Sequence, residues 1–329
     1  MLILEKEERI LREILFYDDE NLKKEDFISI DYENLIMIAS ENLMIPALYC
    51  QLKKKKYLKY IPNDFEVYIR EIYTINKNRN EILLREVKGL NNILKTQKIK
   101  HIFLKGASYI NNIYKDLGER MIGDIDFLVD NHNLKKTISI LKKNKYANHY
   151  EFKLWKTKHS RRLVNKNRLF AVEPHTEIIL FRNRKTFQGS ELLINKNHQN
   201  TENLLKICIL NAQINDYGNL YAKINLRAFY DFKKIIGEKN LNLSEFNNKY
   251  YRRFLILTNL YGISKFKFKK TFFDKVFLKR VVLKRKIKVY RLIDNYICWL
   301  IKMTFKTPMQ LIEFIINSEY RSHILKKIN

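Results

Sequence analysis

Two aspartates stand one residue apart in the segment GERMIGDIDFLVD, residues 118–130, at the start of an apolar run. Side chains alternate between the two faces of a β-strand, so Asp124 and Asp126 would share a face with their Cβ atoms roughly 6–7 Å apart. Two carboxylates at that distance repel each other, and a divalent cation such as Mg²⁺ bound by both removes the repulsion. The pair predicts a metal-binding strand, and the alternative is an ordinary strand with a polar edge.

A third acid follows in AVEPHTEIILF, residues 171–181, which has the pattern of another strand. On such a strand Glu173, His175 and Glu177 would form one polar row. Pro174 favours an edge position, so an exposed face of an antiparallel edge strand is the alternative. We expect Glu173 to complete the metal site, with Glu177 as the substitute if Glu173 points away. His175 would contact a ligand or orient Glu173.

The spacing of apolar residues predicts the elements that must position these side chains. Spacings of three and four residues predict helices at 4–17 and 31–54 and one or two long helices over 64–97. The period then changes, and a helix over 107–118 would be closed by Gly118. The central segments are predicted as strand, helix, strand, helix and strand-like pieces, at 101–106, 107–118, 121–129, 132–146 and 147–181. His159, in the last of these, is a further candidate for lining the same cleft.

This order of elements predicts an α+β protein with a small mixed sheet and three regions. They are a helical N-terminal region (1–97), an α/β core (98–182) and a helical C-terminal region (183–329). Only 8 Gly and 4 Pro are present, which favours long helices and argues against an all-β sandwich with its many turns.

The chain is strongly basic, with a formal net charge of +28. Such a field attracts nucleic acid, nucleotides or an anionic membrane face, although a genome rich in A and T would also raise the lysine content. The three cysteines show no metal-ligand spacing and fit free thiols in a reducing cytoplasm. Charges interrupt the N-terminus and the apolar stretch 289–305, so we expect a cytoplasmic protein with no transmembrane segment.

The stretch 265–291 interleaves lysine and arginine with aromatic residues, and Asp274 is its only acid. Basic grooves with aromatic platforms hold RNA, and the same pattern can lie on an anionic membrane. A helical layer with aromatics in the core and lysines in water is the third interpretation. The sequence leaves all three open.

The segment LKGASYINNIYKDLGERMIGDIDFLV resembles the signature of a large, poorly characterised bacterial nucleotidyltransferase family in the DNA polymerase β-like superfamily. The resemblance covers about residues 30–235 and includes a familial helical aspartate, Asp231, expected to cap or to pair internally. It rests on Leu104–Lys105–Gly106, Tyr114, Arg120, the run Asp124–Ile125–Asp126–Phe127–Leu128–Val129, and Glu173–Pro174–His175. A polymerase β-like core is the fold that this resemblance implies.

The resemblance also implies Mg²⁺- or Mn²⁺-dependent transfer of a nucleotidyl group from an NTP such as ATP to an acceptor. Asp124 and Asp126 would bind the metal ion that holds the triphosphate, and Glu173 would join them at a second ion. The candidate nucleotide contacts are Lys105, Arg120, the backbone at Gly106, which has no Cβ to block an approach, and Ser108.

Two departures from the family pattern affect these assignments. Ala107 follows Gly106 where the superfamily prefers serine, so Ser108 would either contact phosphate or cap the helix. Pro174 stands where an apolar residue is usual, which puts the role of Glu173 in doubt.

The acceptor stays open between RNA, in particular tRNA, a small molecule, a polysaccharide precursor and a protein side chain. A different class of function is a basic RNA- or membrane-binding protein on a degenerate transferase scaffold. A toxin–antitoxin component is a further alternative, by analogy alone.

Overall fold

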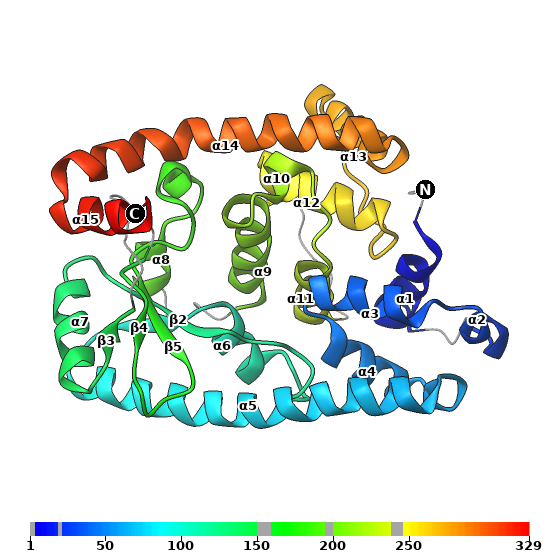
Figure 1. Cartoon of the computed structure of the whole chain (residues 1–329), viewed down its shortest axis with the longest axis horizontal. Helices are drawn as coiled ribbons and strands as arrows, with labels where there is room; N and C mark the ends of the chain where they lie inside the picture. Colours follow the sequence, from blue (N-terminus) through cyan, green and yellow to red (C-terminus); the bar gives the residue numbers. More distant parts are fainter. Residues whose placement is uncertain (1–3, 19–21, 150–158, 195–199, 238–245, 329) are drawn as a thin grey trace.

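The computed structural model describes residues 4–328 except 19–21, 150–158, 195–199 and 238–245. Long helices surround one small sheet (Figure 1). The strands are β1 (His101–Phe103), β2 (Asp124–Val129), β3 (Ala147–Asn148), β4 (Leu163–Val164) and β5 (Ala171–His175). Their order across the sheet is β1-β2-β5-β4-β3, with β2 and β5 parallel and the other neighbours antiparallel. The expected α+β class with a small mixed sheet is confirmed.

Strand β2 alternates as its sequence predicts. Ile125, Phe127 and Val129 are buried in a core that includes apolar residues of the long helix α5 (Asn63–Thr96). The opposite face of β2 carries Asp124 and Asp126 at its beginning and the buried Leu128. Burial of one complete face sets the register, because a slip by one residue would move every apolar side chain off the core. The two aspartates therefore share a face, as expected.

Pro174 does not mark an edge strand, and the expectation drawn from it is wrong. Strand β5 is internal, with β2 on one side and β4 on the other. The Pro174 carbonyl accepts a hydrogen bond from the backbone N–H of Ser160 at 2.7 Å. The N–H that proline lacks would lie on that same side, where β4 is only two residues long.

The helix expected over 107–118 is shorter and begins earlier, as α6 (Lys105–Asn112). Gly118 therefore closes no helix. A Cβ on it would lie 2.2 Å from the Tyr73 ring, so close packing against α5 requires glycine there. Part of the strand-like stretch expected in 147–181, residues 150–158, lies outside the described residues.

The helices that precede the sheet region in the sequence and the helices that follow it share one large hydrophobic core. That core joins residues of the N-terminal helices, such as Leu48, to residues of the later helices, such as Phe229 and Phe254. The N-terminal helices are α1 (Lys6–Phe16), α2 (Lys24–Ile28), α3 (Tyr32–Glu41) and α4 (Ile45–Lys54). The division of the chain at residues 97 and 182 stays a prediction.

The later helices include one very long member, α14, which lies along the edge of the molecule opposite α5 (Figure 1). Among the described residues no single helix is long and apolar enough to cross a membrane, although α3 and α4, bent by 119°, pass that test as a pair. Helix α7 (Leu134–Lys143) lies between β2 and β3 in the chain. The helices after β5 are α8 (Gly189–Ile194), α9 (Thr201–Leu210), α10 (Gly218–Tyr221), α11 (Leu226–Ile236), α12 (Lys249–Leu260), α13 (Phe272–Lys286), α14 (Lys288–Ile316) and α15 (Ser318–Ile328).

Candidate active site

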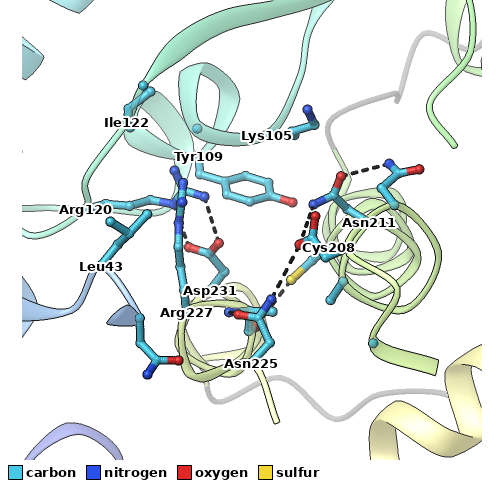
Figure 2. A pocket seen from close by; sticks show the side chains of 18 of the residues that line it. Leu43, Lys105, Tyr109, Arg120, Ile122, Cys208, Asn211, Asn225, Arg227 and Asp231 are labelled. Atoms are coloured by element: carbon cyan, nitrogen blue, oxygen red, sulfur yellow. Dashed lines mark hydrogen bonds and ion pairs between the residues drawn. The ribbon is translucent and has the colours of Figure 1, made fainter. Parts of the chain in front are cut away.

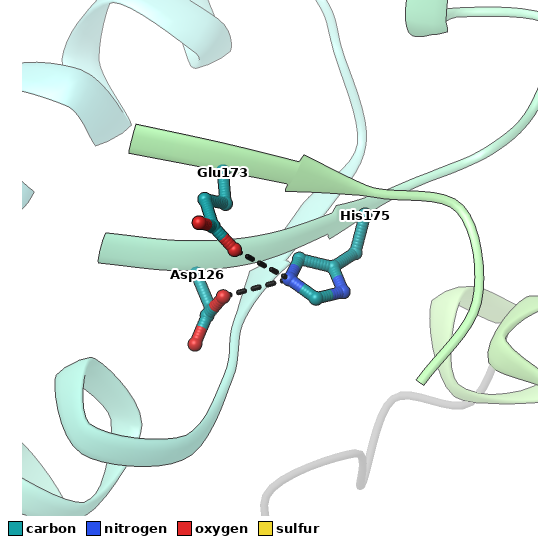
Figure 3. A group of neighbouring side chains, drawn as sticks. All are labelled: Asp126, Glu173 and His175. Atoms are coloured by element: carbon teal, nitrogen blue, oxygen red, sulfur yellow. Dashed lines mark hydrogen bonds and ion pairs between the residues drawn. The ribbon is translucent and has the colours of Figure 1, made fainter. Parts of the chain in front are cut away.

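The parallel pairing of β2 and β5 brings together acids that are far apart in the sequence. Asp126 lies directly opposite Glu173 in the register, and His175 follows two residues later on the same face of β5. One ligand atom from each of Asp126, Glu173 and His175 lies within 4.8 Å of the others (Figure 3). The three side chains are close enough to hold one cation, and they join the two predicted strands into one site.

Asp126 is almost fully buried, with 3% of its surface exposed, yet both of its oxygens have partners. The Lys105 ammonium donates to Oδ2 at 2.7 Å, and His175 Nε2 lies 2.7 Å from Oδ1. Burial alone would raise the pKa of Asp126, but His175 and Lys105 outweigh it and hold that pKa well below its usual value. Asp126 is therefore ionised at neutral pH, although it lies inside the protein.

The pKa values of the other two acids, Asp124 and Glu173, are raised instead of lowered. Burial and the charge of Asp126 raise the pKa of Asp124, while burial and then Asp126 and Asp124 raise the pKa of Glu173 to about 7. The Arg162 guanidinium lies between them, 3.8 Å from Asp124 Oδ2 and 3.8 Å from Glu173 Oε1. Both distances exceed a hydrogen bond, so Arg162 offsets the negative charge without closing the site.

A divalent cation fits this set of donors. Three carboxylates crowd one end of the β2–β5 pair, and burial together with the charges of Asp126 and Asp124 raises the pKa of Glu173 to about 7. Carboxylate oxygens are the ligands that Mg²⁺ and Mn²⁺ prefer, and the imidazole of His175 already orients the Asp126 carboxylate. Asp126 and Glu173 form the compact part of the predicted metal set, and Asp124 lies at its more exposed edge.

The turn between β1 and α6 supplies the lysine of the site in an unusual backbone conformation. Lys105 has a φ of +48°, in the left-handed region that side chains other than glycine rarely adopt. The neighbouring position requires glycine for lack of space. A Cβ on Gly106 would lie 2.7 Å from Arg120 Nη1 and 2.9 Å from Ile122. The missing Cβ thus clears space for Arg120.

The structure excludes the capping role predicted for Ser108, and its phosphate contact stays a prediction. It lies inside α6, whose N-terminal capping position is Leu104, so it does not cap the helix. Its side chain is 2% exposed, and its hydroxyl has no hydrogen-bond partner among the described residues. It does not line the cavity beside Lys105 and Gly106.

Arg120 is anchored by Asp231 of α11. Its Nε and Nη2 donate to the two carboxylate oxygens at 2.7 and 2.9 Å (Figure 2). The Tyr114 hydroxyl donates to Oδ1 at 2.6 Å. The internal pairing of Asp231 agrees with the expectation. Arg120 Nη1 is buried and has no partner among the described residues, which leaves it as the part of this guanidinium able to meet a ligand.

A cavity of about 450 Å³ opens beside the acids. Asp124, Asp126, Lys105 and Arg120 line it, together with Arg227, which is mostly buried on α11 (Figure 2). Further polar lining comes from Lys223 and Asn225 and from the π-helical segment η3 (Asn211–Asn215), a geometry often found at functional sites. The cavity is polar, and its lining mixes four basic side chains with five acids, so a triphosphate would need a bound divalent cation beside Asp124 and Asp126.

Two arginines of this site were missed by the sequence reasoning. Arg227 stands four residues before Asp231, so the two share a face of α11, and that spacing was the available signal. Arg162 had no comparable signal, because the short strand β4 brings it to the acids only through sheet pairing.

Comparison with known families decides what kind of protein carries this site. A family model described as an uncharacterised nucleotidyltransferase matches residues 29–250. The chain belongs to this family. It is therefore a transferase, and the match includes the strands, the acids and the cavity, whereas residues 251–329 lie beyond it. No curated protein and no solved structure matches the chain significantly.

Two further residues complete the comparison between prediction and structure. Glu177 lies beyond the end of β5, and its Oε2 accepts from the Gly189 N–H at 3.4 Å, so it stands apart from Asp126, Glu173 and His175. His159 lies beside the acids, with Nδ1 4.0 Å from Glu173 Oε2 and its ring 5.0 Å from that of His175.

Proposed function

We propose that this protein transfers a nucleotidyl group from an NTP to an acceptor with the help of Mg²⁺ or Mn²⁺. The observation that carries the proposal is a cavity lined by Asp124 and Asp126 together with two arginines and two lysines, with Glu173 directly opposite Asp126 on the neighbouring strand. We further propose that the sheet is a polymerase β-like core, since a parallel strand pair carries the three acids. The three free cysteines support action in the reducing cytoplasm.

The carboxylates would bind the metal ion, and the basic side chains of the cavity would bind the triphosphate. Asp126 and Glu173 are the compact ligand pair, with Asp124 adding a third carboxylate from the exposed side. Arg120 Nη1 and Arg227 offer guanidinium groups to phosphate oxygens, which they suit by geometry. Lys105 now neutralises Asp126 and lies close enough to the same cavity to reach a phosphate.

The transfer itself makes one bond and breaks one. The acceptor oxygen bonds to the α-phosphorus as the bond to the bridging oxygen breaks, and pyrophosphate leaves with that electron pair. A divalent cation bound by the acids would neutralise the charge that develops on these oxygens. The acceptor gives up its proton as the new bond forms, and the proton leaves to solvent.

A second, more apolar cavity of about 460 Å³ meets the first at Asp124 and Arg227. Leu43, Ile72 and Met121 contribute to its wall. We propose that the acceptor enters from this side, so that the nucleotide and the acceptor meet at the acids from two directions. The chemistry of the acceptor, whether RNA, small molecule or protein, is the question for the assay.

The test uses NTPs labelled at the α-phosphate, each incubated with the protein, a cell extract and Mg²⁺ or Mn²⁺. We expect label to enter RNA, protein or a small-molecule fraction only when the divalent ion is present, with release of pyrophosphate. Asp126→Asn should abolish the transfer, whereas Asp130→Asn, just beyond the end of β2, is the matched control and should retain it. Absence of ion-dependent label with all four NTPs in every extract would refute the proposal.

A further inference from the structure

Helix α14 carries its apolar side chains on the outside of the protein. Val289, Leu292, Ile293, Tyr296, Trp299 and Leu300 are between 42% and 65% exposed. At 3.6 residues per turn they fall within an arc of about 120°. A helix on the surface of a soluble domain normally packs its apolar stripe against the core. Helix α14 instead exposes its apolar stripe to solvent.

Charged and polar contacts fix this orientation from the inner side. Asp294 accepts from Arg280 of α13 at 2.6 and 2.8 Å and lies 2.8 Å from the Lys284 ammonium. One turn later Cys298 is buried, and the Lys302 ammonium lies 4.6 Å from the centre of the Tyr217 ring. The polar face of α14 is thus the docked face, and the apolar face is left without a partner among the described residues.

A basic flank borders the apolar arc. Lys288, Arg291 and Lys306 are exposed and recur on one side of α14 at helical spacing. Exposed lysines of the adjoining α13 and of the preceding segment extend the positive charge, and Asp274 is the only acid between residues 265 and 291. Tyr296 and Trp299 stack on each other with centroids 5.8 Å apart, within the apolar arc.

We propose that α14 docks on an anionic lipid bilayer, with its apolar arc in the boundary between headgroups and acyl chains and its basic flank on lipid phosphates. An apolar face beside a lysine- and arginine-rich flank, with a tryptophan where the two meet, is the pattern of helices that lie in a membrane interface. This proposal concerns residues beyond the family match and does not rest on the proposed transferase activity.

Charge and side-chain type distinguish this partner from two others. A second copy of the chain would bring the same basic flank and the same net charge of +28 against the first, which opposes close pairing. RNA is held by aromatic platforms in grooves, whereas Leu292, Ile293 and Leu300 offer aliphatic surface that cannot stack on bases. An anionic bilayer satisfies both the apolar arc and the basic flank.

The test measures flotation of the full chain with vesicles, without NTP or divalent ion. We expect binding to vesicles of 30% phosphatidylglycerol in phosphatidylcholine, weakened by salt, and much weaker binding to phosphatidylcholine alone. With Trp155→Phe as background, Trp299 is the sole tryptophan, and its emission should shift to shorter wavelength and be quenched by brominated acyl chains.

Two variants and one control distinguish the contribution of the apolar arc to vesicle binding from that of the basic flank. Leu292→Ser/Ile293→Ser should weaken binding about tenfold for each side chain. Ile28→Ser/Met37→Ser, on exposed positions of other helices, is the matched control and should bind normally. Replacing Lys288 by Gln should weaken binding to anionic vesicles about fivefold and leave the weak binding to neutral vesicles unchanged.

The outcomes are distinguishable. Equal binding to neutral and anionic vesicles, or an unshifted Trp299, would overturn the proposal. So would concentration-dependent dimerisation, or RNA binding, that is lost in Leu292→Ser/Ile293→Ser while vesicles are not bound. Unchanged thermal melting and circular dichroism of this variant will show that it is folded, so loss of vesicle binding alone supports the proposal.

Discussion

The buried ion pair between Arg120 and Asp231 permits a quantitative test of how the site is held. Asp231→Asn keeps the shape of the side chain and removes its charge, which leaves a guanidinium that is 6% exposed without a counter-charge. Breaking a buried pair in this way typically costs about 3–5 kcal/mol of unfolding free energy. With an m-value of about 3 kcal/mol per molar urea, the unfolding midpoint should fall by roughly 1–2 M.

Urea unfolding followed by circular dichroism measures this shift, and the same helix provides the control. Lys233 of α11 pairs with Asp18 at 3.0 Å, but the Asp18 side chain is 74% exposed, so Asp18→Asn should cost less than about 1 kcal/mol. Arg120→Met/Asp231→Leu removes both charges and should recover much of the loss. If Asp231→Asn is no more destabilising than Asp18→Asn, the argument that burial makes this pair strong is refuted.

Three further predictions concern the site. Because burial and neighbouring acids raise the pKa of Glu173 to about 7, it is mostly protonated at pH 6 and mostly ionised at pH 8. Mn²⁺ should therefore bind about tenfold more tightly at pH 8 than at pH 6, measured from the paramagnetic resonance of the free ion. Glu173→Gln should flatten this pH dependence. An unchanged pH dependence of Mn²⁺ affinity in Glu173→Gln would contradict the prediction. Gly106→Ala places a methyl group 2.7 Å from the Arg120 guanidinium and should cost about 1–3 kcal/mol in thermal melting, whereas Gly89→Ala, with open space around it in α5, should be neutral or stabilising. Arg227→Met should weaken NTP binding at least tenfold in equilibrium dialysis, and an unaltered dissociation constant would remove Arg227 from the phosphate site.

The pattern of apolar and polar residues correctly predicted those parts of the fold that depend on one segment of the chain. The alternation of DIDFLV predicts a strand with both aspartates on one face, and β2 has that geometry because its other face is buried. Contacts between distant segments account for the errors. Gly118 looked like the end of a helix but is required by the ring of Tyr73, and Pro174 looked like an edge residue but lies inside the sheet.

The sequence by itself determined the chemical types in the site: two aspartates at strand spacing, an acid followed by a histidine, and a lysine–glycine turn. Only the tertiary structure decided that β2 and β5 are parallel neighbours with Asp126 opposite Glu173, and that Arg227 and Arg162 join them. The physical reason is that side-chain periodicity records which face of an element is buried. It does not record which other element covers that face, because the covering depends on packing free energy summed over segments far apart in the chain.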